Sequence, residues 1–267
     1  MSVRRIVVQA PRILVISPHL DDAALSLGAT IAHASRLGSD VTALTVFGGD
    51  PASLAPAAGW DRACGFATAG EAARERRLED ERACALMGAT PSWLELADAD
   101  YAPLRSDDEA WSTLAPQLAE ADLVLTPGFP LEHPDHAWLT RLLLERMPAD
   151  ARLALYVEQP YANLKVIGRG YSRGPLLAAL RVALRTPAGR HSQQPQACDA
   201  GVQKLFPAPQ WIAAASDRAA QTAKAKAIAA YSSQLDHLGG RVVGRIRLYE
   251  SGWGGEGIGV RNLEALR

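Results

Sequence analysis

Short apolar runs alternate with stretches of helical length and pattern through residues 12–160. Strands separated by helices of this length imply parallel pairing with right-handed crossovers. The pattern therefore predicts an α/β fold, a Rossmann-like three-layer arrangement with a mostly parallel sheet. The GxGxxG phosphate fingerprint is absent after the first predicted strand, so we expect a variant that binds no nucleotide. The predicted strands are Arg12–Ile16, Val41–Val46, Trp93–Leu96, Leu123–Thr126 and Leu153–Val157, and the predicted helices are Ala23–Gly38, Glu71–Met87, Asp107–Glu120 and Asp135–Arg146.

The alternation weakens after Tyr161, where Gly, Pro and Ala become frequent. No internal repeat or low-complexity segment marks a linker, which favours one domain over residues 1–267. We expect residues 12–160 to form its core and residues 161–267 to complete the cleft. The remaining predictions are helices at Leu176–Leu184 and Trp211–Gln234, a strand at Arg245–Glu250, and loops at Gly48–Gly70 and Gly252–Gly259.

Composition limits the possible partners. The formal net charge of -1 and the lack of a strongly basic tract argue against general nucleic-acid binding. No apolar run reaches the ~18 residues that a membrane span needs, and Met1–Ala10 does not resemble a signal peptide. The 3 cysteines are widely spaced without a CxxC motif, which favours free thiols in a reducing cytoplasm. We expect a cytoplasmic protein that acts on a small molecule.

Two predicted strands are each followed by a cluster of His and Asp. Ser17–Asp22 (SPHLDD) follows the apolar run Ile13–Ile16, and His133–His136 (HPDH) follows the run Asp122–Thr126. In open α/β sheets, ligands bind outside the carboxyl ends of the strands. The two clusters therefore predict one metal site assembled from both.

The residue types in these clusters leave two interpretations open. Asp21 or Asp22 could simply cap the helix that follows. The second cluster favours metal binding, because imidazole and carboxylate are ordinary Zn²⁺ ligands and a catalytic zinc keeps three protein ligands plus a water. His19, Asp22 and His136 would supply two imidazoles and one carboxylate. Similar sets also hold Fe²⁺, so the residues alone do not identify the metal.

The clusters resemble the motifs of a known family, the PIG-L/LmbE-like zinc deacetylases. Ser17–Gly28 (SPHLDDAALSLG) resembles the family's first motif, and His133–His136 resembles its second. Arg74–Gly88 is similar to the family's charged helix, with Met87 in place of a Leu, and Lys224–Gln234 is similar to its Lys-containing helix. These enzymes remove N-acetyl groups from N-acetylglucosamine-type sugars and their conjugates. The resemblance implies a zinc-dependent N-deacetylase.

The first motif departs from the family pattern at two positions. Leu20 stands where the family usually has Pro, which alters only local stiffness. Ala23 stands where the family has Glu, so a carboxylate near the site is missing. This loss affects the expected carboxylate support of the metal site and the expected substrate contacts. It leaves the three expected metal ligands in place.

The resemblance also implies roles for three further residues. Asp21 would act as the general base toward a metal-activated water. His133 would stabilise the tetrahedral oxyanion and, when protonated, could deliver a proton to the leaving amine. Asp135 would orient or charge that imidazole, and it could also cap the helix Asp135–Arg146.

Substrate contacts are predicted from position as well as from resemblance. Arg76 or Arg77 lies near the family's arginine that reaches sugar hydroxyls, although a plain exposed arginine explains either residue equally well. Glu158 and Tyr161 follow a predicted strand end and should face the cleft. The expected partner is a small amino-sugar conjugate. The sequence leaves open the sugar, the aglycone, the acyl group and the oligomeric state.

Three competing functions remain at this point. An amidase of the same family, acting on a larger thiol-sugar conjugate, would have the same metal site and a different pocket. A non-catalytic sugar-binding relative is supported only by Ala23. A phosphatase-like hydrolase with an Asp nucleophile would leave the second His cluster unexplained and lacks a phosphate-binding pattern.

Overall fold

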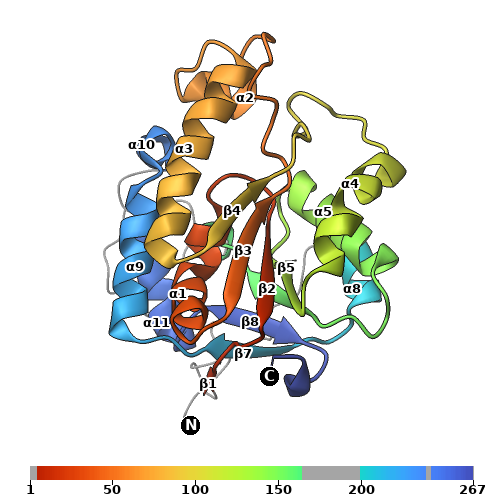
Figure 1. The fold of residues 1–267 in the computed structure, drawn as a ribbon, viewed down its shortest axis with the longest axis vertical. Coiled ribbons are helices and arrows are strands. Elements are labelled where there is room, and N and C mark those ends of the chain that lie inside the picture. Colours follow the sequence, from red (N-terminus) through yellow and green to blue (C-terminus); the bar gives the residue numbers. More distant parts are fainter. Residues whose placement is uncertain (1–4, 164–198, 239–241, 267) are drawn as a thin grey trace.

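The computed structural model of the chain describes residues 5–163, 199–238 and 242–266. Within these residues, eight strands form one sheet with the order β1-β7-β8-β6-β5-β2-β3-β4 (Figure 1). Every pairing is parallel except those of β8, which runs antiparallel to both of its neighbours. The strands are β1 (Arg5–Ile6), β2 (Arg12–Ser17), β3 (Asp40–Thr45), β4 (Thr90–Trp93), β5 (Leu123–Phe129), β6 (Leu153–Val157), β7 (Gln210–Ala214) and β8 (Gly257–Val260).

Helices cover both faces of the sheet. One layer contains α1, α3 and α9, which pack on one another, and the other contains α4, α5 and α8 (Figure 1). This three-layer arrangement around a mostly parallel sheet confirms the predicted fold class. The helices are α1 (Asp22–Arg36), α2 (Gly59–Ala63), α3 (Ala69–Met87), α4 (Asp107–Ala119), α5 (Pro134–Arg146), α8 (Ala200–Leu205), α9 (Arg218–Ala229), α10 (Ser232–Leu238) and α11 (Val242–Trp253), with a 3₁₀ turn η1 at Leu263–Leu266.

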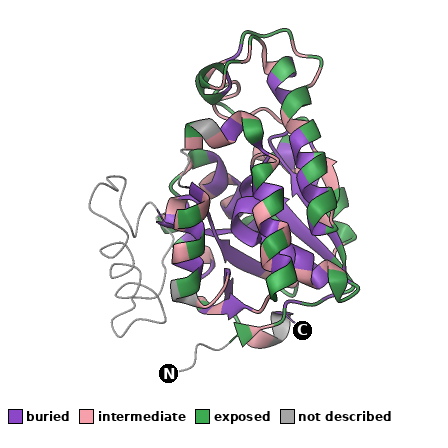
Figure 2. Ribbon diagram, turned by 90° about the vertical axis from the view of Figure 1, so that its left-hand side faces the viewer, coloured by how far each residue is buried: buried purple, intermediate pink, exposed green. Residues whose placement is uncertain are grey.

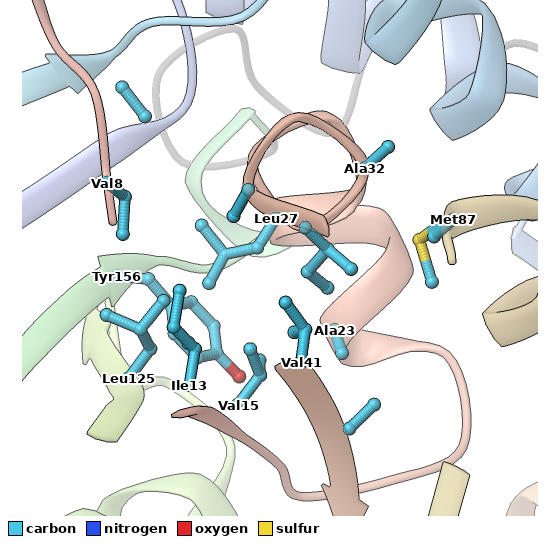
Figure 3. Packing of buried hydrophobic residues seen from close by; sticks show 14 of the residues in the cluster. Val8, Ile13, Val15, Ala23, Leu27, Ala32, Val41, Met87, Leu125 and Tyr156 are labelled. Carbon is cyan, nitrogen blue, oxygen red and sulfur yellow. The ribbon is translucent and has the colours of Figure 1, made fainter. Parts of the chain in front are cut away.

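The central strands are buried on both faces, which explains why they read as continuous apolar runs. Side chains alternate between the two faces of a strand. In β2, Ile13 and Val15 join the cluster formed with α1 and its residue Leu27 (Figure 3), whereas Leu14 and Ile16 pack with residues of α4 and α5. Figure 2 shows buried strands between helices whose outer faces are exposed. One core therefore lies on each side of the sheet.

The C-terminal segment differs from the sequence prediction. The expected helix Trp211–Gln234 begins as strand β7, and helical structure starts only at Arg218. The Ala-rich run favours a helix locally. Here Gln210–Ala213 instead pairs with β8, and β1 pairs with Ala213 and Ala214 of the same strand. Tertiary pairing outweighs the intrinsic propensity of these residues.

Two further predictions in this segment are wrong. The expected strand Arg245–Glu250 lies inside α11, where Val242, Ile246 and Tyr249 are buried at a helical spacing. The expected loop Gly252–Gly259 contains most of β8. A Cβ at Gly259 would lie 3.0 Å from ring atoms of Trp211, so glycine allows the indole to pack against the strand.

The other differences are small. The predicted strand Trp93–Leu96 occurs earlier, at Thr90–Trp93, and the predicted loop Gly48–Gly70 contains the short helix α2. The predicted helix Leu176–Leu184 lies outside the described residues. No helix in the described ranges has the length and apolar character needed to cross a membrane.

Candidate active site

The two His/Asp clusters meet at one edge of the sheet. Strands β2 and β5 are parallel neighbours, so their carboxyl ends lie side by side. His19 and Asp21 lie between β2 and α1, and His133 lies at the start of α5. The structure therefore brings together the groups that the sequence placed on separate strands.

Three donor atoms face one another at this edge. His19 Nδ1 lies 3.1 Å from His136 Nε2, His136 Nε2 lies 3.2 Å from Asp22 Oδ2, and Asp22 Oδ2 lies 3.3 Å from His19 Nδ1. Zinc bonds of 2.0–2.1 Å in tetrahedral geometry separate neighbouring ligand atoms by about 3.3–3.4 Å. The spacing and chemistry of this triangle fit a divalent cation. His133 belongs to the same cluster, with a ring nitrogen within 4.8 Å of those of His19 and His136.

Buried carboxylates hold both imidazoles of the triangle. His136 Nδ1 lies 3.2 Å from Glu158 Oε1, and Glu158 Oε2 accepts a hydrogen bond from the Leu131 N–H at 3.0 Å. His19 Nε2 lies 3.0 Å from Asp135 Oδ2. Each imidazole therefore has one nitrogen on a carboxylate and the other in the triangle, an arrangement common for metal-binding histidines.

Glu158 and Asp135 thus lie elsewhere than the sequence suggested. Glu158 is 1% exposed and contacts the ring nitrogen of His136 that faces away from the triangle. Asp135 Oδ2 is 3.9 Å from His133 Nδ1, which is too far for a hydrogen bond, and contacts His19 instead. Both carboxylates are placed to orient the imidazoles of the triangle.

The charges in the triangle are strongly coupled. Burial favours the neutral form of Asp22, but His136 and His19 outweigh it and hold the pKa of Asp22 well below its usual range. Burial also opposes charge on the imidazoles, yet the neighbouring carboxylates raise the pKa of His19 to about 9 and that of His136 to about 10. A cation that binds these nitrogens must displace protons.

Asp21 has an unusual backbone conformation, and its side chain does not cap the helix that follows it. It occupies the N-cap position of α1, but no side-chain hydrogen bond caps the helix. Its φ of 153° and ψ of −28° lie in a sparsely populated region, a form of strain that concentrates at functional sites. Burial and then the charge of Asp22 raise the pKa of Asp21 well above its usual value. The capping interpretation therefore fails for Asp21, whose carboxyl group makes no hydrogen bond to the N-terminus of α1.

Among the described residues, one ring nitrogen of His133 has no hydrogen-bond partner. Its Nδ1 accepts a hydrogen bond from the Asp135 N–H at 3.3 Å, so the neutral ring carries its proton on Nε2. Burial, His19 and His136 lower the pKa of His133 to about 4. The ring centroid lies 4.9 Å from those of His19 and His136. Its Nε2–H is a hydrogen-bond donor next to the triangle.

The predicted substrate contacts separate into two groups. Arg76 forms an ion pair with the buried Asp61, and its charge lowers the pKa of Asp21, although burial and Asp22 raise that pKa more strongly. The Tyr161 ring lies edge-on to His136, with centroids 5.3 Å apart. Arg77 instead donates to the Gly48 and Gly49 carbonyls and therefore holds the loop after β3.

Arg105 was missed by the sequence analysis. It donates to Asp135, and its guanidinium lies 4.4 Å from the Phe47 ring centroid and 5.2 Å from that of Trp138. Arg105 stands in a loop without a motif, so nothing in the sequence connects it with Asp135. Only the folded arrangement shows that these residues are neighbours.

Sequence comparison decides the family. The family profile described as PIG-L, GlcNAc-PI de-N-acetylase, matches residues 14–147. The chain belongs to the PIG-L family. The matched segment contains all the donor atoms of the triangle, as well as Asp21 and His133. No curated protein sequence matches the chain.

Several solved structures are similar to this PIG-L family chain. The A40926 pseudoaglycone deacetylase is 26% identical, with a TM-score of 0.64, and the match covers 93% of this chain and 96% of that one. The zinc-inhibited form of the teicoplanin deacetylase Orf2 is 20% identical, with a TM-score of 0.62 and coverage of 93% and 97%. The N,N'-diacetylchitobiose deacetylase from Pyrococcus horikoshii is 20% identical, with a TM-score of 0.53 and coverage of 96% and 85%. The last two establish the shared fold.

Proposed function

We propose that the chain is a divalent-metal-dependent hydrolase that removes an N-acyl group, most simply acetyl, from an N-acetylglucosamine-type sugar conjugate. The observation that carries this proposal is the triangle of His19, Asp22 and His136, with donor atoms 3.1–3.3 Å apart, beside the uncapped Asp21. Membership of the PIG-L family and the deacetylases among the similar structures support the choice of an amide bond as the target.

The three donors of the triangle would hold the cation, with Zn²⁺ as the first choice and Fe²⁺ as another ion that such donors bind. A cation bound there would polarise the amide carbonyl and lower the pKa of a water molecule. Glu158 and Asp135 position the two imidazoles, since each contacts the ring nitrogen that faces away from the triangle.

Asp21 is the general base in this proposal. Its carboxyl group is not engaged by the helix that it precedes, and a cation bound in the triangle would favour the ionised form that a general base requires. Asp21 takes a proton from the attacking water as the new C–O bond forms at the acyl carbon. When the C–N bond breaks, the proton that Asp21 took from water passes to the leaving nitrogen, and the products are the carboxylic acid and the free amine.

His133 stabilises the charge that develops on the carbonyl oxygen. Its Nδ1 is occupied by the Asp135 N–H, which leaves Nε2–H as the donor toward the cleft. Donors that are already oriented toward a developing oxyanion lower the barrier without reorganisation. Arg76 and Tyr161 are assigned to substrate contacts, because both lie beside the site. The charge of Arg76 lowers the pKa of Asp21, and the Tyr161 ring flanks His136.

Metal content and acetate release test the proposal together. Purified protein should contain a divalent metal in a 1:1 ratio and release acetate from at least one N-acetylglucosamine conjugate. Removal of the metal by a chelator should abolish the release, and Zn²⁺ or Fe²⁺ should restore it. A metal-free wild-type protein that is fully active would contradict the proposal.

A panel of substrates separates the proposal from its alternatives. An amidase acting on a thiol-sugar conjugate would cleave the larger amide and leave N-acetyl groups intact. A non-catalytic relative would bind the sugar and release nothing. The complete donor set and the uncapped Asp21 argue against this alternative.

A further inference from the structure

The side chain of Arg105 is held between three elements. It belongs to the loop between β4 and α4, and only 13% of it is exposed. Its guanidinium packs over the ring of Phe47, which follows β3, and near the ring of Trp138, which belongs to α5. Its Nε donates to the Ala102 carbonyl at 3.2 Å. A planar cation between aromatic rings, with a further hydrogen bond, has little freedom to move.

The terminal nitrogen of Arg105 donates to Asp135 Oδ1. The other oxygen of Asp135 lies 3.3 Å from the Ala99 N–H and 3.0 Å from His19 Nε2. Asp135 is 1% exposed, so water does not compete for these contacts. Arg105 and the backbone therefore fix the plane of the carboxylate that His19 meets.

The position of that carboxylate decides how His19 can bind. With its Nε2 proton directed to Asp135, His19 leaves the lone pair of Nδ1 for the triangle. A rotated Asp135 would lose this contact and release the ring. Carboxylates behind metal-binding histidines fix both the tautomer and the ring orientation, and their loss weakens metal affinity about 10–100-fold.

We propose that Arg105 is a positioning residue of the active site, which fixes Asp135 and through it presents His19 to the cation. This inference rests on the proposed metal-dependent function and goes beyond it, because Arg105 touches neither the triangle nor the substrate in this account. The chain of contacts runs from the aromatic pair to Arg105, then to Asp135 and His19.

The decisive measurement is the Zn²⁺ dissociation constant, obtained by competition with a chromophoric chelator. Arg105→Gln removes the charge, and Arg105→Lys keeps the charge but loses the planar guanidinium. We expect Zn²⁺ to bind about 10-fold more weakly in Arg105→Gln, with Arg105→Lys between it and the wild type. If Arg105→Gln does not fold, Arg105→Lys provides the same comparison.

Arg261→Lys is the matched control. Arg261 also packs over an aromatic ring, that of Phe206 at 4.7 Å, and donates to the Leu205 carbonyl at 3.0 Å. It follows the antiparallel strand β8 and so lies at the opposite edge of the sheet from the triangle. Its replacement should leave Zn²⁺ affinity unchanged.

A double-variant cycle tests whether Arg105 acts through Asp135. If it does, Arg105→Gln should add little to the loss of affinity in Asp135→Asn, because residues in one network are not additive. Additive losses, or unchanged Zn²⁺ affinity in Arg105→Gln and Arg105→Lys, would overturn the inference. If wild-type protein itself binds no divalent metal, the proposed function fails; if wild type binds metal and deacetylates while the Arg105 variants bind as tightly, only the inference fails.

Discussion

His136 Nδ1 lies 3.2 Å from Glu158 Oε1, and neither side chain is open to solvent. This contact determines which nitrogen of His136 faces Asp22 and His19. Glu158 in turn is fixed by the Leu131 N–H at the start of the loop that leads into α5. A residue expected at the substrate surface thus supports the imidazole of a proposed metal ligand.

Glu158→Gln should weaken Zn²⁺ binding. The amide can accept from His136 Nδ1 only by turning its NH₂ group toward the Leu131 N–H, which sets two donors against each other. We expect an increase of about 10–100-fold in the Zn²⁺ dissociation constant, measured by chelator competition, with the exposed Glu145→Gln as control. Unchanged Zn²⁺ affinity with a raised KM would instead assign Glu158 to the substrate.

His133→Ala should lower kcat and leave KM almost unchanged. An oxyanion donor acts in the transition state and not in the ground state. The loss of one such donor costs about 10²–10³-fold in kcat. Steady-state acetate release measures it, with His33→Ala on α1 as the control. A raised KM at normal kcat would show that His133 is only a substrate contact.

The strands of the first half could be predicted because burial on both faces produces uninterrupted apolar runs. Arg12–Ile16 and Leu153–Val157 agree closely with β2 and β6 for this reason. The second half could not be read in the same way. The strand that begins near Trp211 is Ala-rich, and β8 contains two glycines, so their strand character comes from partners distant in sequence.

The residues of the site also differ in how far the sequence could predict them. His19, Asp22 and His136 could be named because their side chains follow strands and carry recognisable chemistry. The carboxylate partners of these proposed ligands could not be predicted, since an Asp or Glu near a strand end gives no sign of which imidazole it will meet. Asp135 is next to His136 in sequence, yet its carboxylate contacts His19. Arg105 reaches the site only because the loop between β4 and α4 passes close to the start of α5, where Asp135 lies.

Lys224→Met should destabilise the fold and should not change the metal site directly. Lys224 Nζ donates to Glu250 at 2.5 Å and to Glu256 at 2.6 Å, and all three residues are buried. Loss of one partner from a buried ionic cluster costs about 3–5 kcal/mol. Urea unfolding measures the loss, with the exposed Lys226→Met on the same helix as control. A change below about 1 kcal/mol would match an exposed ion pair and contradict this account.

The stability of Lys224→Met should also change with pH in a definite direction. Burial already raises the pKa of Glu250 to about 7, against the pull of Lys224. Without Lys224 the pKa of Glu250 rises further above the unfolded value of ~4.3. The folded state then binds more protons than the unfolded state, so the variant should lose stability as the pH rises from 5 to 8. Parallel stability curves for Lys224→Met and wild type would exclude this coupling.

Asp21 and His136 are assigned separate tasks, one in proton transfer and one in holding the cation. Metal content and acetate release should therefore be measured on the same preparations of Asp21→Asn and His136→Ala. We expect Asp21→Asn to keep a full equivalent of metal and lose about 10²–10⁴-fold in rate, and His136→Ala to lose the metal while keeping its fold. Asp217→Asn, at the N-cap of α9, is the control for Asp21 because its side chain does cap its helix. Wild-type activity in Asp21→Asn, or full metal retention in His136→Ala, would contradict the account.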